Sequence, residues 1–430
     1  MTVNADLRAL MGFSAGNHIL GSLTKEAGVT VTSNVATCDT TQAHRWSPQG
    51  QHNFAPTPPT GYTKLATVDE FVLQRSGTAG ADHKILGWEG LGGNAADCIK
   101  ITESTAGVWS FYVAGVFVGT YTPANSTDYH IAIWCTGRGA GGTSYLSAWD
   151  TGWQVWVTVL IDKVVIFNQE IIATGPGNPR YGVPIFGEGA ALGGANSAVF
   201  KVSHYGGGYS DRANPIGKIT AAQWTLRLGQ TPPAGYDDGT SKTPSADAAA
   251  DVDETPPAGS GTTDVDYFDL TNNGTPAEQL CALAQNILAA GDVLYAVASK
   301  VWERTATSGK VAGVGTMLYD GTNRANIGLD AQTGPTSYAE DLAGDAGIAI
   351  WNNAPDGAAW SGKANAYLNG CWAGCYVSTL NTSANNRIDA QVIETAVVKS
   401  GDAISALADP TALVLATPSP ALMGLAAGII

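Results

Sequence analysis

The sequence predicts an all-β protein built from two jelly-roll or β-sandwich domains in tandem. The chain has 430 residues, more than one ordinary hydrophobic core accommodates, so two domains of roughly 200 residues each are expected. Only 14% of the residues are charged and 53 are glycine, a composition typical of short strands joined by tight turns. Strand-like runs then follow one another at regular spacing through the first half of the chain.

The densest strand-forming run is residues 153–172, WQVWVTVLIDKVVIFNQEII, and we interpret the first domain as built around it. Its residues alternate as a pair of strands with a turn near Asp162-Lys163, and both faces carry apolar side chains. The pair is therefore expected to lie inside a sandwich with its outer face partly covered. A buried helix stays open from periodicity alone, although the β-branched residues disfavour it.

Further strand candidates run from residue 68 to residue 211, about seven over the whole stretch, as in a two-sheet jelly roll. Glycine-rich turns at 77–80, 92–94 and 139–142 separate them. The opening MGFSAGN, then CIKITESTAGVWSFYVAGVFVGTYT, YHIAIW, the central hairpin and the closing FKVSHYGGGYSD together resemble the concanavalin A-like (laminin G-like) jelly-roll domains of tailed-bacteriophage virion proteins. The resemblance covers the first half and implies a particle-building or receptor-facing role.

We divide the chain into a jelly-roll domain at 1–215, a connecting segment at 216–265, a second β-sandwich at 266–405 and a C-terminal arm at 406–430. The connecting segment is rich in Pro, Gly, Ser and Asp, which by composition favours a disordered linker. The resemblance continues through this part and implies that the segment is largely ordered.

The second domain has a weaker strand pattern than the first. Strands are expected near 293–304, 310–318, 325–329, 346–351 and 390–398. Residues 275–292 have apolar side chains at helical spacing after Thr275-Pro276, whereas the resemblance favours a strand near 280–288. Both alternatives stay open.

The last 21 residues, 410–430, contain no charged side chain, but three prolines interrupt them. Without a basic flank they do not predict a membrane span. An extended apolar arm that docks on the chain itself or on another subunit explains them better, because an exposed segment of this kind promotes association. The protein is therefore expected to be a homo-oligomer.

Charge and cysteine content exclude some classes of protein. A net charge of −15 argues against binding nucleic acid, which needs clustered Lys and Arg. The six cysteines are scattered, and the spacing of Cys371 and Cys375 matches neither a redox pair nor a zinc site, so buried thiols are expected, with a bridge between these two left open. The first residues lack the pattern of a signal peptide, which favours synthesis in a host cytoplasm.

Sequence motifs for catalysis are missing. No pair of carboxylates is spaced as in jelly-roll glycosidases, the six histidines show no metal-ligand spacing, and Gly12–Gly16 matches a nucleophile elbow only by chance in this β-rich context. We therefore expect no enzyme and no cofactor. Asp251, Asp253, Asp264 and Asp266 form either a solvated acidic loop or a Ca²⁺ site.

Twelve tryptophans raise the possibility of sugar binding, since sugars stack on aromatic rings. Most lie within strands and are expected in the core, whereas Trp46, Trp88, Trp149 and Trp360 lie nearer turns and are the candidates for glycan contact. The sequence thus predicts a structural component of a bacteriophage virion, tail- or fibre-associated or decorating the capsid, that contacts other virion proteins. The alternative is a glycan-binding module that recognises host surface glycans.

Overall fold

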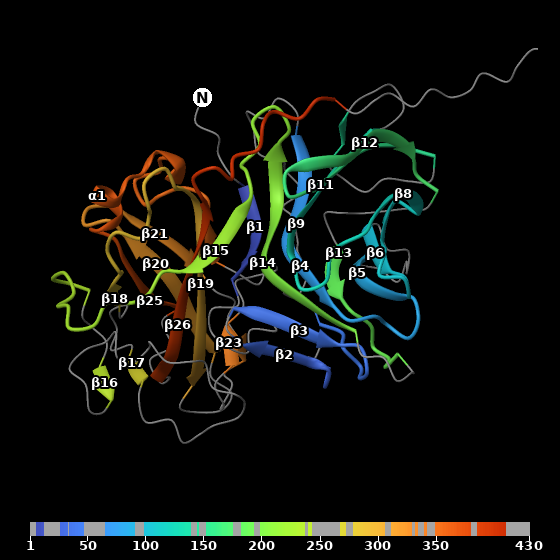
Figure 1. Ribbon diagram of the computed structural model, residues 1–430. Coiled ribbons are helices and arrows are strands. Elements are labelled where there is room, and N and C mark those ends of the chain that lie inside the picture. Colours follow the sequence, from blue (N-terminus) through green and yellow to red (C-terminus); the bar gives the residue numbers. More distant parts are fainter. Residues whose placement is uncertain are drawn as a thin grey trace, which may run out of the picture.

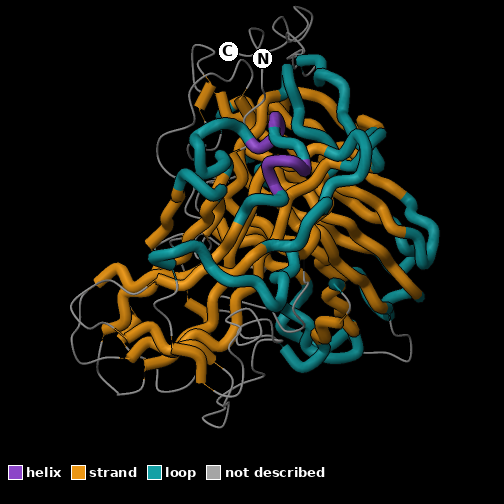
Figure 2. Tube along the Cα trace, turned by 90° about the vertical axis from the view of Figure 1, so that its left-hand side faces the viewer, coloured by secondary structure: helices purple, strands orange, loops and turns teal. Residues whose placement is uncertain are grey.

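The computed structural model describes the residues 6–12, 26–32, 34–46, 65–90, 99–138, 144–145, 152–174, 182–192, 198–236, 240–242, 267–271, 278–305, 311–328, 332–333, 339–341, 349–379 and 385–409. Strands dominate these ranges, which confirms the predicted all-β class (Figure 1). Helical residues in the same ranges are confined to one neighbourhood, a turn of 3-10 helix at Trp360–Gly362 and α1 at Asn365–Leu368 (Figure 2).

The strands of the described ranges form four antiparallel sheets, which we name A to D. Sheet A has the order β12 (Val164–Ile172), β11 (Gln154–Ile161), β9 (Asp128–Arg138), β4 (Leu65–Ser76), β14 (Val199–Asp211), β3 (Val35–Asp39) and β2 (Val29–Thr32), with β1 (Asp6–Met11) paired to β14 and β10 (Ser144–Tyr145) paired to β9. Sheet B has the order β13 (Gly182–Phe186), β5 (His83–Gly90), β6 (Ile99–Glu103), β7 (Trp109–Val113) and β8 (Val116–Tyr121).

Sheets C and D contain the second half of the chain. Sheet C has the order β16 (Thr240–Lys242), β17 (Tyr267–Thr271), β26 (Asn385–Val398), β19 (Val293–Thr305) and β23 (Ala339–Asp341), with β15 (Ile219–Gln223) paired to β26 and β24 (Ala349–Trp351) paired to β19. Sheet D has the order β18 (Glu278–Ala282), β25 (Trp372–Thr379), β20 (Val311–Tyr319) and β21 (Arg324–Gly328), with β22 (Gln332–Thr333) paired to β20.

The four sheets stack in the order B, A, C, D (Figure 1). One core lies between sheets A and B, and another lies between sheets C and D. A third apolar cluster joins sheet A to sheet C, with Leu7 and Leu10 of β1 against Ala296, Ala396 and their neighbours. The chain therefore folds as two β-sandwiches packed back to back.

The alternation of side chains in β19 and β26 explains this stacking. Val297 and Val397 belong to the core between sheets C and D, whereas Ala296 and Ala396 belong to the contact with sheet A. Both faces of the strand pair are apolar, so both must be covered, and the small alanines allow sheet A to approach closely.

Polar contacts also lie at the boundary between the sandwiches. The Lys300 ammonium lies 2.9 Å from Oε2 of Glu394, and both side chains are fully buried. The other carboxylate oxygen of Glu394 accepts a hydrogen bond from the backbone N–H of Gly12, at 3.0 Å. Asn352 accepts from the N–H of Leu7 and donates to its carbonyl oxygen. These bonds satisfy polar groups that the contact removes from water.

The hairpin predicted at 153–172 is confirmed as β11 and β12. Its turn is at Asp162-Lys163, where both residues have positive φ, 47° and 69°, as a tight two-residue hairpin turn requires. The expectation that the domain is built around this hairpin is wrong, because β12 is the edge strand of sheet A, with Val164 64% exposed. The long strands β4, β9 and β14 occupy the middle of that sheet instead.

The segment from Lys399 to Asp409 leaves the second sandwich and crosses the outer face of sheet A, drawn in red at the top of Figure 1. Ile404 and Leu407 are buried there against β4, β9 and β11. The N–H of Leu407 donates to the carbonyl oxygen of Arg212, and the Arg212 guanidinium donates to the carbonyl oxygen of Ala408. The outer face of β11 is therefore partly covered, as its apolar residues predicted.

The structure also bears on the predictions for residues 275–292, the connecting segment, the C-terminal arm and the cysteines. Within 275–292 the strand alternative is confirmed in part, since β18 covers Glu278–Ala282 and turns follow it. Part of the connecting segment forms β15 and β16 of sheet C, and 243–265 lie outside the described residues, as does the apolar arm at 410–430. Cys371 and Cys375 are both buried, and neither forms a disulfide. Within the described ranges, no helix is long and apolar enough to cross a bilayer.

Candidate functional site

A pocket of about 570 Å³ opens at one end of sheet B. Its walls come from β5, β6 and β7, from the residues that follow β13, and from the loop that precedes Trp46. The lining residues are Arg45, Asp82, His83, Lys84, Lys100, Thr102, Tyr112, Gly187, Glu188 and Gly189. Polar and charged side chains dominate this list, in contrast to the apolar cores on either side of sheet A.

The sequence directs these side chains outward by simple alternation. In β6 and β7, IKITE and WSFYV, the residues Ile99, Ile101, Trp109, Phe111 and Val113 are buried in the core. The residues between them must point to the opposite face of the sheet. That outer face carries Lys100, Thr102, Ser110 and Tyr112, each only partly buried.

Strand register places these outward residues in two rows that cross the sheet. In one row Lys100 of β6 lies opposite Tyr112 of β7, which lies opposite Phe117 of β8. In the other row the cross-strand neighbours are Lys84, Thr102, Ser110 and Thr120. An aromatic row therefore lies beside a row of hydroxyl groups on one face of sheet B.

Tyr112 is the centre of the aromatic row. The ammonium nitrogen of Lys100 lies 4.6 Å from the centre of its ring, within the range of a cation–π contact. The ring of Phe117 meets Tyr112 edge to face, with 5.6 Å between the ring centres, and Phe117 is 54% exposed. The row offers exposed aromatic surface next to a positive charge.

Two carboxylates at the rim are held by backbone groups. Oε1 of Glu188 accepts a hydrogen bond from the N–H of Lys84 at 2.6 Å, and Oδ1 of Asp82 accepts from the N–H of Thr105 at 2.9 Å. These bonds fix the loops that enclose the pocket. The second oxygen of each carboxylate has the chemistry to accept a hydrogen bond from a ligand hydroxyl.

His83 also lines the pocket, but only 3% of it is exposed. Its ring packs between those of His44 and Phe200, with ring centres 6.4 and 6.3 Å away. Burial lowers the pKa of His83, and the charge of Glu103 opposes that shift only in part. The imidazole is therefore neutral at pH 7 and supplies part of the wall.

The tryptophans predicted for glycan contact do not form this site. Trp46 is fully buried, with its indole N–H donating to Sγ of Cys38 and its ring stacked on Phe186 at 4.7 Å. Trp360 is 1% exposed and donates to the carbonyl oxygen of Trp351. For these two the prediction is wrong, because a turn in sequence can still pack against a core. The side chain of Trp88 and all of Trp149 lie outside the described residues.

The acidic residues named as Ca²⁺ candidates, Asp251, Asp253, Asp264 and Asp266, also lie outside the described residues. Within the described part of the chain, no group of three or more His, Cys, Asp or Glu side chains is arranged to hold a metal ion. The Ca²⁺ prediction therefore stays a prediction.

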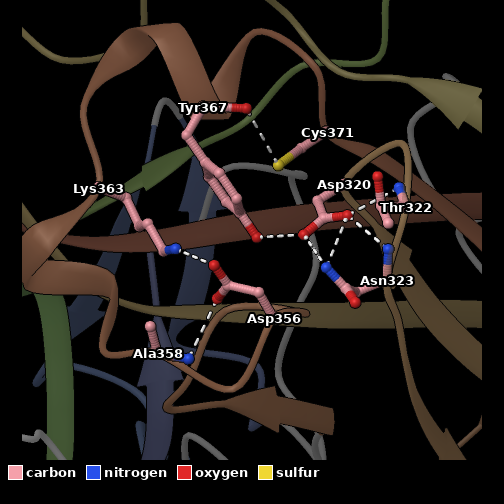
Figure 3. Close-up of polar contacts among 8 residues, drawn as sticks. All are labelled: Asp320, Thr322, Asn323, Asp356, Ala358, Lys363, Tyr367 and Cys371. Carbon is pink, nitrogen blue, oxygen red and sulfur yellow. Dashed lines mark hydrogen bonds and ion pairs between the residues drawn. The ribbon is translucent and has the colours of Figure 1, made fainter.

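A second cluster of titratable side chains lies in the second sandwich (Figure 3). Asp320, in the turn between β20 and β21, accepts hydrogen bonds from the hydroxyl of Tyr367 at 2.8 Å and from the N–H groups of Thr322 and Asn323. Asp356 pairs with Lys363, whose ammonium also lies 4.0 Å from the centre of the Tyr367 ring.

The protonation states in this cluster indicate a structural role. Burial opposes ionisation of Asp320, but hydrogen bonds from Asn323 and Tyr367 outweigh it and hold the pKa of the carboxyl below its usual value. Burial, aided by the charge of Asp320, raises the pKa of the Cys371 thiol to about 12. The carboxylate is thus ionised and saturated with donors while the thiol stays protonated, so the cluster holds α1 against the β20–β21 turn.

The chain was compared with known protein families, curated proteins and solved structures. No family model matches the chain, and no curated protein matches it either. Among solved structures the chain is similar to a sialidase, with 9% identity over 48% of this chain and 19% of that chain and a TM-score of 0.30. Alginate lyase A1-II′, of polysaccharide lyase family 7, matches with 9% identity over 44% of this chain and 86% of that chain, at a TM-score of 0.28.

A GH131 β-glucanase catalytic domain from Podospora anserina matches with 10% identity over 40% of this chain and 71% of that chain, at a TM-score of 0.23. The Trypanosoma rangeli sialidase matches with 12% identity over 42% of this chain, and the match spans only 26% of its length. These named structures contradict the expectation that the chain is not an enzyme, which we withdraw. At such TM-scores the likeness assigns no activity or substrate to this chain.

Proposed function

We propose that this chain binds carbohydrate on the outer face of sheet B. The observation that carries the proposal is the row Lys100–Tyr112–Phe117 beside a pocket of about 570 Å³. Sugars present apolar C–H faces that pack on aromatic rings and hydroxyl groups that need hydrogen-bond partners. A concave site with a few convergent polar groups suits such a ligand.

The polar groups beside the ring are available to a ligand. Among the described residues, the ammonium of Lys100 and the hydroxyls of Thr102 and Tyr112 have no hydrogen-bond partner within the chain. All three line the pocket. Groups that keep their hydrogen-bonding capacity in a pocket form bonds to a bound hydroxyl without first breaking internal ones.

The test is titration of the full chain with a panel of oligosaccharides by calorimetry, comparing wild type with Y112A and F117A. We expect each variant to weaken binding about tenfold, equivalent to about 1.4 kcal/mol of lost stacking. The matched control is L228A, which truncates an apolar side chain 51% exposed outside the pocket and should bind as wild type. The proposal fails if wild type binds no saccharide, or if Y112A and F117A bind as tightly as wild type.

A virion structural role is the second candidate function, since the sequence resemblance suggests it and an exposed sheet edge favours it. The edge strands β8 and β12 lie in contact on one side of the first sandwich. Phe117 is 54% exposed, Val164 64% and Val165 44%. Exposed edge strands with apolar side chains are templates for pairing with another chain.

The second candidate, a virion component assembled in a host cytoplasm, is tested by sedimentation of three proteins. The full chain should self-associate, and V164K and a chain truncated after Asp409 should do so more weakly. The truncation removes the apolar residues 410–430 but keeps Ile404 and Leu407 on sheet A. If both variants assemble as tightly as the full chain, neither the edge nor the arm serves assembly.

A further inference from the structure

The pocket on sheet B concentrates positive charge in an acidic protein. The whole chain has 22 basic and 37 acidic residues, a net charge of −15. Three of the ten residues that line the pocket are basic, Arg45, Lys84 and Lys100, and two are acidic, so the lining charge is 3 − 2 = +1 with a neutral His83. Local charge opposite in sign to the rest of the chain attracts ligands of the opposite charge.

Lys100 is the clearest cation of the set. Among the described residues no carboxylate forms an ion pair with its ammonium. The ammonium instead makes a cation–π contact with Tyr112, 4.6 Å from the centre of the ring. The ring holds the ammonium in place without neutralising it. A positive charge held beside an aromatic surface in a pocket is a binding group for an anion next to an apolar surface.

Arg45 adds a second cationic donor to the lining. Its Nη2 lies 3.4 Å from Oε1 of Glu26, a long ion pair, and the Arg45 side chain remains 38% exposed. A Cβ on Gly189 would lie 3.5 Å from Cζ of Arg45, so the guanidinium lies against the pocket backbone. A guanidinium so placed keeps N–H groups that suit a planar carboxylate or a sulfate.

The two acidic side chains of the lining offset part of the positive charge and leave an excess of +1. Glu188 is held by the N–H of Lys84 and Asp82 by the N–H of Thr105. These hydrogen bonds hold one oxygen of each carboxylate against the loops that enclose the pocket. The excess positive charge of the lining favours a ligand with negative charge.

We infer that the saccharide taken by this pocket is acidic, with its anionic substituent bound by Lys100 and Arg45 while its ring packs on Tyr112. This inference rests on the proposed carbohydrate binding and names the class of sugar. Carboxylate and sulfate substituents share the required chemistry, a compact negative charge that accepts several N–H bonds. Neutral saccharides lack it and lose that part of the interaction.

The experiment uses the full chain and three probes with one backbone: an oligogalacturonide, its carboxyl-reduced neutral form, and a sulfated derivative of the neutral form. We expect the acidic probes to bind at least about tenfold more tightly than the neutral one, and their affinity to fall with added salt. The carboxylated and sulfated arms separate the two possible anions.

Three lysine variants assign the effect to the pocket. K100M keeps the apolar stem but removes the ammonium, so it should remove most of the preference for the acidic probes, with a larger loss of affinity for them than for the neutral probe. K100R should retain the preference. K399M replaces a lysine of the second sandwich whose side chain is 46% exposed, and it should bind all three probes as wild type does.

Equal binding of the acidic and neutral probes, or an equal loss for both in K100M, overturns the acidic preference while carbohydrate binding itself stands. Absence of binding to all three probes overturns the acidic preference, and absence of binding across the whole oligosaccharide panel overturns the proposed carbohydrate binding as well.

Discussion

Replacing Lys300 by methionine is expected to destabilise the folded protein by about 3–5 kcal/mol. Lys300 and Glu394 form an ion pair of 2.9 Å at the contact between the sandwiches, with side chains 1% and 0% exposed. Methionine keeps the length and apolar volume of the lysine stem, so the change isolates the charge. The carboxylate of Glu394 would then stay buried without its cation, which is the costly outcome for a broken buried pair.

The double variant K300M/E394Q tests that reasoning. A glutamine oxygen still accepts the hydrogen bond that Gly12 N–H now donates to Glu394 at 3.0 Å, while the buried charge is gone. The double variant should therefore regain most of the stability lost in K300M, giving a coupling energy of roughly 2 kcal/mol or more in a double-mutant cycle.

The free energy of unfolding of each variant is measured by guanidinium unfolding, followed by circular dichroism and tryptophan fluorescence. The control is K399M, because Lys399 pairs with Asp292 at the surface with its side chain 46% exposed, and such pairs contribute about 0–1 kcal/mol. The reasoning is refuted if K300M costs no more than K399M, or if adding E394Q to K300M restores nothing.

Two further predictions concern the cores. Burial raises the pKa of Asp69 to about 8, against the hydrogen bond from Tyr205 at 2.8 Å, so the folded protein holds a proton that the unfolded chain releases near pH 4. The stability that this group contributes is fully present below about pH 4 and is lost as the pH rises to about 8. From pH 5 to 8 the melting temperature should therefore fall more steeply in wild type than in D69N. Parallel curves for the two proteins would contradict this prediction. In sheet D, a Cβ on Gly374 would collide with the carbonyl oxygen of Gln279, so G374A should lower stability by about 1–3 kcal/mol in thermal unfolding. G119A, whose Cβ would have no atom within 4 Å, serves as its control, and an equal effect of both would refute the steric argument.

Local pattern in the sequence was enough to predict the all-β class and several of the strands. The alternation around Asp162-Lys163 predicted both strands of the β11–β12 hairpin and its turn, because side-chain direction in a strand depends only on neighbouring residues. The same alternation in IKITE and WSFYV contained the outward set of Lys100, Thr102 and Tyr112, and counting polar residues between buried ones would have found it.

Strand order and burial were decided by contacts between distant residues. The sequence did not show that β12 is an edge strand, since that depends on which strands pair with β11. Trp46 and Trp360 lie near turns, yet the cores of the two sandwiches bury them. Burial is set by everything that packs around a side chain, and neighbours in sequence supply only part of it.

The candidate site shows the same division. The outward residues of β6 and β7 could be predicted, but the pocket also needs Arg45 and Glu188, which lie 55 and 88 residues from Lys100 in sequence. The pairing of β13 with β5 and the bridge between Trp46 and Phe186 bring these segments to one end of sheet B. Long-range strand pairing carries no local sequence signature, so tertiary structure alone decided where charge and aromatic surface meet.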